Sequence, residues 1–139
     1  MEHDYQKKSY KLFAVWMLLV AALTVFYIYK KPWQAVIGPG KATGILMFIM
    51  VDLLFMIIYF TESVYWVSGI SYEDAAKAGR RARKQFAAKH LVVFLLMTFF
   101  LILYCAVSGN LWNGSTIRDA LVSAALLCAA VLFTGKIRL

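Results

Sequence analysis

The strongest constraint on this chain is a set of four apolar segments, each close to the length that crosses a lipid bilayer. They cover residues 12–29, 42–67, 91–107 and about 117–134. A helix rises about 1.5 Å per residue, so roughly 20 residues cross the hydrocarbon layer. The chain is 63% hydrophobic over 139 residues, well above the level of a soluble domain. We therefore expect an all-α, polytopic membrane protein with four transmembrane helices, forming a single integral membrane domain over residues 1–139.

The first and fourth segments each carry a qualification. Lysines precede the first segment, which leaves a cleaved signal peptide as an alternative. The segment exceeds the roughly 7 to 15 residues of a signal core, and Tyr27, Tyr29 and Lys30 stand where small cleavage-site residues belong. The fourth segment begins with Arg118 and Asp119, which leaves its fully apolar part near the minimum spanning length.

The distribution of basic residues predicts the orientation, because Lys and Arg are retained on the cytoplasmic side. With four spans, 11 of these residues share a side with both termini and the loop 68–90, and 4 lie on the other side. We therefore expect both termini to be cytoplasmic, in a cell membrane of the bacterial inner-membrane type. This distribution accounts for the net charge of +8 without a nucleic-acid partner.

The loop between the second and third spans has the pattern of a basic amphipathic helix. Ser71 can cap free backbone N–H groups, and Glu73 and Asp74 follow at the positive end of the helix dipole. We expect one cytoplasmic helix over about 72–90 that continues directly into the third span. Its cations form a predicted site for anionic lipid or a partner: Lys77, Arg80, Arg81, Arg83 and Lys84.

Three interpretations of this basic helix remain open. Its cations lie on anionic headgroups, each contributing about 1 kcal/mol near the surface. Alternatively, its small Ala and Gly face docks against a partner or a second copy. Binding of an anionic ligand or RNA is the third, but only Tyr72 and Phe86 are present to stack on bases, so we expect no nucleic acid.

Two acids interrupt the second span, in MFIMVDLLFMIIYFTESVYW (residues 47–66). A charge near the bilayer centre costs from about 2.5 to more than 10 kcal/mol, so such acids are protonated, paired or in contact with water. At about 100° per residue, one polar stripe is expected along the helix. It forms the predicted ion- or solute-binding site: Asp52, Tyr59, Glu62 and Ser63.

The two acids differ in depth and therefore in their expected partners. Glu62 is near the cytoplasmic border, where it either reaches the interface or pairs with Lys89, His90 or a cation of the basic helix. Asp52 is deeper, and the other three apolar cores contain no Lys or Arg. Its expected partners are a bound cation, a proton or hydroxyl groups, which are those of Thr24, Tyr59, Thr98 and Tyr104.

Other patterns predict structure more than chemistry. Cys105 and Cys128 lack redox spacing, and His3 and His90 are far apart, so we expect no metal, cofactor or catalytic residue. The segment IGPGKATG (37–44) lacks the spacing of a phosphate loop and is interpreted as a turn that starts the second span. Alanines spaced four apart predict that the fourth span lies inside the bundle or at a subunit interface. The bulky side chains of the third span predict that it faces lipid.

These features favour a small membrane transporter or channel subunit over an enzyme. It would move, or couple to, a proton, cation or small solute through Asp52, as a homo-oligomer or as a small subunit of a membrane complex. The alternative is a non-catalytic adaptor or regulatory subunit that recruits a partner or anionic lipid through its basic helix. An enzyme that modifies lipids is less favoured, because two acids and one tyrosine specify no reaction.

Overall fold

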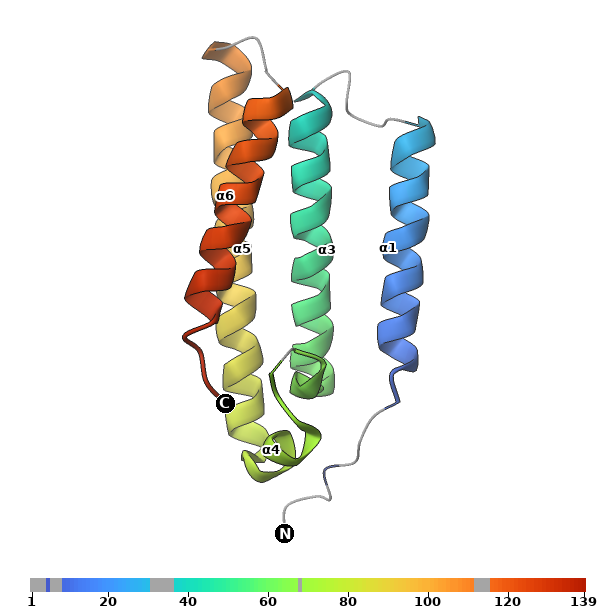
Figure 1. The fold of residues 1–139 in the computed structure, drawn as a ribbon, viewed down its shortest axis with the longest axis vertical. Helices are drawn as coiled ribbons and strands as arrows, with labels where there is room; N and C mark the ends of the chain where they lie inside the picture. Colours follow the sequence, from blue (N-terminus) through green and yellow to red (C-terminus); the bar gives the residue numbers. More distant parts are fainter. Residues whose placement is uncertain (1–4, 6–8, 31–36, 68, 112–115) are drawn as a thin grey trace.

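The fold is a set of four long helices with no strand in the part of the chain that is described (Figure 1). The computed structural model describes residues 5, 9–30, 37–67, 69–111 and 116–139. The long helices are α1 (Lys11–Lys30), α3 (Pro39–Thr61), α5 (Gly79–Leu111) and α6 (Thr116–Thr134). All four are long and apolar enough to cross a membrane, which confirms the predicted all-helical class with four helices of spanning length.

The second long helix is displaced toward the N-terminus relative to the predicted span of 42–67. It begins at Pro39, because proline fits the first helical position, where no backbone N–H is needed. It ends at Thr61, because Glu62 adopts the left-handed conformation with φ 59°. A short 3₁₀ helix, η1 (Val64–Trp66), follows instead of a continued span.

The loop forms two helices rather than the single helix predicted for 72–90. A short helix, α4 (Tyr72–Lys77), begins where expected, and the Ser71 hydroxyl accepts the Asp74 N–H at 3.0 Å. The helix then breaks, because Gly79 has φ 70°, a conformation that glycine adopts at little cost. From Gly79, α5 continues without interruption through the predicted third span, so only the second half of the loop is continuous with it.

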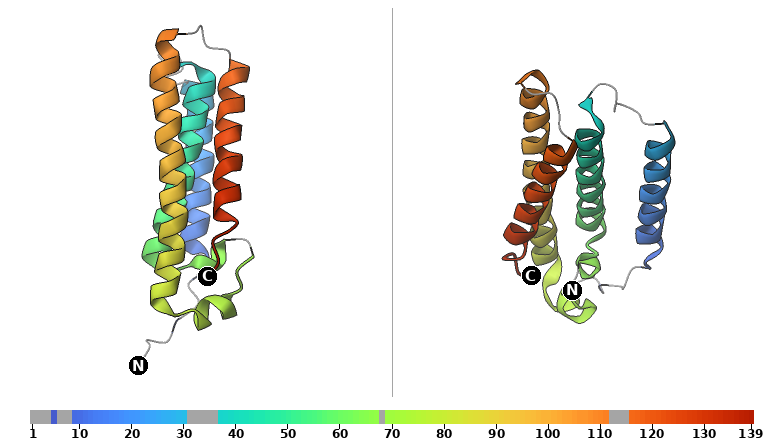
Figure 2. Two further views of the ribbon diagram at one scale, coloured as in Figure 1. Left: turned by 90° about the vertical axis from the view of Figure 1, so that its left-hand side faces the viewer. Right: turned by 45° about the horizontal axis from the view of Figure 1, so that its top comes forward.

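The helices α3, α5 and α6 pack together, and α1 stands beside α3 on the side away from them (Figures 1 and 2). The contacts of α5 with both neighbours bury Phe94, Met97 and Leu101. The prediction that the third span faces lipid is therefore wrong for this face of α5. Most of α1 is exposed, and it is tied to α3 by the Trp16 Nε1–H, which donates to the Met50 carbonyl at 3.1 Å.

Two glycines of α3 allow α6 to approach closely. A Cβ at Gly40 would lie 2.8 Å from Asp119 Cβ, and one at Gly44 would lie 2.3 Å from Ser123 Oγ. These glycines, rather than the alanines of α6, make the close packing within the chain. Ala120 and Ala124 are exposed.

The start of α1, the helix α4 and the C-terminal residues lie at the same end of the bundle, which we call the α4 end (Figure 1). The opposite end, where α5 is followed by α6, is called the far end. His3 and three of the basic residues counted above, which are Lys7, Lys8 and Lys31, lie outside the described residues.

Candidate functional site

Asp52 lies at the interface of α3 and α5, and its side chain is buried. The Thr98 Oγ1 of α5 lies 2.7 Å from Asp52 Oδ2. The other carboxyl oxygen, Oδ1, is buried and has no hydrogen-bond partner among the described residues. Of the hydroxyls that the sequence offered as partners for Asp52, Thr98 is the one that the fold brings to it.

The direction of the hydrogen bonds of Thr98 depends on whether Asp52 is protonated. Thr98 Oγ1 also lies 3.0 Å from the Phe94 carbonyl, but a hydroxyl has a single hydrogen to donate. When Asp52 is ionised, Thr98 donates to it and the bond to Phe94 is lost. When Asp52 is neutral, its own O–H donates to Thr98, and Thr98 donates to Phe94. Thr98 can therefore form a hydrogen bond with Asp52 in both its ionised and its neutral form, and these two forms differ by one proton.

Apolar side chains separate Asp52 from the next polar groups along the interface. Toward the α4 end, Phe55 and Phe94 stack with ring centroids 5.1 Å apart, and His90 stacks on Phe55 at 5.2 Å. Toward the far end, Phe48 and Leu101 are fully buried. Asp52 is therefore enclosed by apolar groups on both sides.

The predicted polar stripe along the second span is interrupted. The side chain of Tyr59 is half-buried, with the Lys84 Nζ 5.5 Å from its ring centroid. Glu62 and Ser63 follow the end of α3, so helical spacing no longer relates them to Asp52. The Ser63 hydroxyl is buried and has no hydrogen-bond partner among the described residues.

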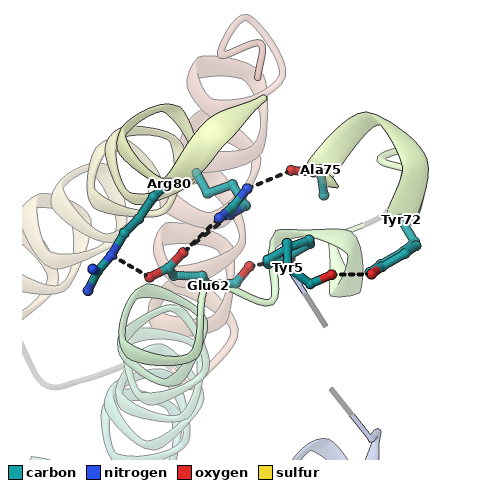
Figure 3. A network of polar contacts seen from close by, with 6 residues as sticks. Tyr5, Glu62, Tyr72, Ala75 and Arg80 are labelled. Atoms are coloured by element: carbon teal, nitrogen blue, oxygen red, sulfur yellow. Dashed lines mark hydrogen bonds and ion pairs between the residues drawn. The ribbon is translucent and has the colours of Figure 1, made fainter. Parts of the chain in front are cut away.

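Glu62 connects α3 to the start of α5 through two arginines (Figure 3). Arg80 Nε lies 3.1 Å from Glu62 Oε1, and Arg83 Nη2 lies 3.1 Å from Glu62 Oε2. Arg83 is buried, and its Nη1–H also donates to the Ala75 carbonyl at 3.0 Å. Glu62 thus makes the ion pair with the loop that was one of the two interpretations of this residue.

Tyr5 joins the same network from the N-terminal segment (Figure 3). Its hydroxyl donates to the Glu62 carbonyl at 2.7 Å, and its own carbonyl accepts the Tyr72 hydroxyl. The Arg83 guanidinium lies 3.8 Å from the centroid of its ring. Burial raises the pKa of Tyr5 to about 12, although the nearby Arg83 charge acts in the opposite direction.

The structure separates the five cations predicted to bind lipid or a partner. Lys77, Arg80 and Arg81 are exposed, and Lys84 is half-buried beside Tyr59. Arg83 points inward and is committed to Glu62 and Ala75. Arg80 also pairs with Glu62, so Lys77, Arg81 and Lys84 are the three of these cations that form no ion pair among the described residues.

A second buried acid, Asp119, was not selected from the sequence. It accepts the Tyr104 hydroxyl at 2.7 Å, and Lys41 is buried nearby with its Nζ 5.9 Å from the centroid of the Tyr104 ring. The sequence contained a partial signal, because Arg118 and Asp119 stand at the start of an otherwise apolar segment. It gave no indication that Lys41, in the turn that starts the second span, would be buried near Tyr104.

The described residues contain no group of three His, Cys, Asp or Glu side chains that could hold a metal ion. No family model, curated protein or solved structure matches the chain, so its function rests on the geometry of these residues.

Proposed function

We propose that this protein is a small integral membrane transporter or channel subunit that moves, or couples to, a proton, cation or small solute through Asp52. The observation that carries the proposal is the buried carboxyl of Asp52, held by the single hydroxyl of Thr98 and with Oδ1 unpaired among the described residues. A charged side chain inside the hydrocarbon layer raises the free energy of the protein, and ionisable residues in membrane helices are typical of ion and proton pathways.

Polar groups at three levels of one helix interface support this proposal. On α5, Thr98 follows His90 by eight residues and Tyr104 follows Thr98 by six, so at about 100° per residue the three side chains leave the helix within a sector of about 120°. They meet Phe55, Asp52 and Asp119 respectively. The apolar pairs between these levels provide the barriers that a gated pathway needs.

We further propose a cytoplasmic α4 end, a bacterial-type inner membrane and a homo-oligomer. The basic residues near both termini and in the loop support the orientation. The exposed Ala120 and Ala124 of α6 provide the small-residue face that close packing between two copies needs.

The test is a flux measurement on the full chain in phosphatidylcholine vesicles that contain a pH-sensitive dye. A potassium diffusion potential supplies the driving force, and Na⁺ and K⁺ gradients are tested separately. Asp52→Asn keeps the shape of the side chain and removes its titratable charge, so it should abolish the flux. Glu62→Gln is the matched control, which should reduce the flux less because Glu62 is tied to Arg80 and Arg83.

The absence of any flux with these ions, or an unchanged flux in Asp52→Asn, would contradict the transport proposal. The adaptor would then take first place, with anionic lipid or an acidic partner as its target. It is supported by the exposure of Lys77, Arg80 and Arg81 at the α4 end, where Glu62 is already neutralised.

A further inference from the structure

A cavity of about 770 Å³ opens at the α4 end of the bundle, and the stacked Phe55 and Phe94, which line it, separate it from Asp52. Its position follows from the unequal lengths of α5 and α6. These helices are antiparallel, and Tyr104 pairs with Asp119. Counting about 15 residues forward along α6 from Asp119, and the same number backward along α5 from Tyr104, brings Thr134, the end of α6, level with the region of His90. The first three turns of α5 therefore extend beyond α6, and the cavity occupies the space left beside them.

The inner wall of the cavity is apolar. It is formed by Phe55 of α3, Phe94 of α5 and Val131 of α6, and by Ile137 of the C-terminal segment. Each of the three membrane helices of the bundle contributes to it, so the wall is continuous with the interior of the bundle. Such a surface suits a hydrocarbon chain.

Two buried polar side chains, His90 and Thr134, also line the cavity, and the Thr134 hydroxyl already donates to the Ala130 carbonyl of its own helix. His90 is 4% exposed, and its ring lies between Phe55 and Phe86, with centroid distances of 5.2 and 4.2 Å. Its Nδ1 is 3.0 Å from the Phe86 carbonyl, so Nε2 is the ring nitrogen left for a ligand. A ligand with oxygen atoms fits this wall better than a pure hydrocarbon.

The charged residues that line the cavity favour an anion. Lys77 of α4 and Arg138 of the C-terminal segment are both exposed lining residues. The acid among the lining residues, Asp74, already receives the Ser71 hydroxyl at 2.7 Å and lies in the first turn of α4. Among the lining side chains, two cations thus stand against one acid, which is engaged within its own helix.

We propose that this cavity binds an anionic amphiphile, a long hydrocarbon chain that ends in a carboxylate or a phosphate. The chain lies against the apolar wall, and the head lies near Lys77 and Arg138. This inference does not depend on transport through Asp52. The ligand has two possible sources, a free fatty acid or an anionic phospholipid of the bilayer, and they share this chemistry.

The experiment uses the full chain, purified in a non-ionic detergent and analysed by native mass spectrometry after incubation with one probe at a time. The probes are palmitate, phosphatidylglycerol and methyl palmitate, which has the chain without the charge. We expect saturable adducts with palmitate, phosphatidylglycerol or both, and weak binding of methyl palmitate. A palmitate adduct identifies a free acid as a ligand, and a phosphatidylglycerol adduct identifies a membrane lipid.

Two pairs of variants locate the adduct. Ala78 lines the cavity at the end of α4, and Ala76 is exposed on the same helix outside it. Ala78→Phe should abolish binding, whereas Ala76→Phe should preserve it. Replacing Lys77 and Arg138 together by Gln should weaken binding about tenfold or more. Replacing Arg81 and Lys89, two exposed cations outside the cavity, should leave it unchanged.

Elution volume and unfolding temperature show whether each variant is folded. If Ala78→Phe unfolds, the comparison of the two Gln pairs alone tests whether the ligand binds in the cavity. The proposal is overturned if methyl palmitate binds as tightly as palmitate, if folded Ala78→Phe retains the adduct, or if both Gln pairs lose the same affinity. None of these outcomes bears on the flux through Asp52, which is measured separately.

Discussion

Thr98 is the residue on which the state of Asp52 depends most directly. Thr98→Val keeps the shape of the side chain and leaves Asp52 without its hydroxyl, so it should lower the free energy of unfolding by about 1–3 kcal/mol. Thr24→Val is the matched control, because the exposed Thr24 hydroxyl bonds the Val20 carbonyl of its own helix and no other group among the described residues. Unfolding in mixed micelles measures both variants. Equal losses would contradict a specific role for the Thr98 hydroxyl.

Tyr5 should make the N-terminal attachment sensitive to alkaline pH. Its pKa in the folded protein, about 12, lies above the ordinary value of 10.0. The unfolded chain therefore releases the phenol proton first. The stabilisation by neutral Tyr5 is complete below pH 10 and is lost as the pH rises through 12.

Absorbance of tyrosinate should therefore show an ionisation step near pH 12 that disappears in Tyr5→Phe. Tyr29→Phe is the control, because Tyr29 is 80% exposed and makes no part of the network of Figure 3. A step that persists in Tyr5→Phe would assign the late ionisation to another residue.

Sequence patterns predict the burial of single acids better than their partners. Asp52 was recognisable because apolar residues surround it for two turns on each side. Its partner, Thr98, is 46 residues away in the sequence, so predicting this pair requires knowing how α3 is aligned along α5. Asp119 stood at the edge of its apolar segment, where hydropathy alone does not separate a buried acid from a solvated one.

At the scale of helices, the contact of α3 with α6 depends on the missing side chain of Gly44. Gly44→Ala would place a Cβ 2.3 Å from Ser123 Oγ and 3.2 Å from Ser123 Cβ, so it should destabilise the protein by about 1–3 kcal/mol. Ser123→Gly removes both atoms, and alone it should cost about 1 kcal/mol in a helix.

The double variant should therefore be more stable than the sum of the two single losses predicts. Unfolding of the four proteins, the parent, both single variants and the double variant, gives this coupling energy. Additive losses would mean that the two helices separate locally to accept the new methyl group.

Helix ends were less predictable than helix cores. The second span was expected to continue to residue 67 because Val64, Tyr65 and Trp66 are apolar or aromatic. Its end at Thr61 depends on a left-handed Glu62, a conformation held by Arg80, Arg83 and Tyr5 from elsewhere in the chain. The break at Gly79 was missed for a simpler reason, since the glycine was interpreted as part of a small helix face.

At the scale of the whole molecule, the four helices place the start of α1 and the C-terminal segment at the same end (Figure 1). Reporter proteins fused after Lys11 and after Leu139 should therefore both be active in the cytoplasm, because the basic residues favour that side. A reporter fused after Asn113 should be active on the opposite side. Opposite locations for the first two reporters would contradict a chain with four spans.

The pairing of Asp52 with Thr98 also means that Asp52 is synthesised before its hydrogen-bond partner. The acid leaves the ribosome 46 residues before its partner, a delay of roughly 2 to 9 seconds at about 5–20 residues per second. Until α5 follows, the carboxyl lacks the Thr98 hydroxyl, so it must be protonated or remain in contact with water or with the insertion machinery. If α3 spans the membrane, we expect its insertion to be completed together with α5, so a ribosome stalled between Thr61 and Thr98 should leave α3 less completely inserted than the full chain does.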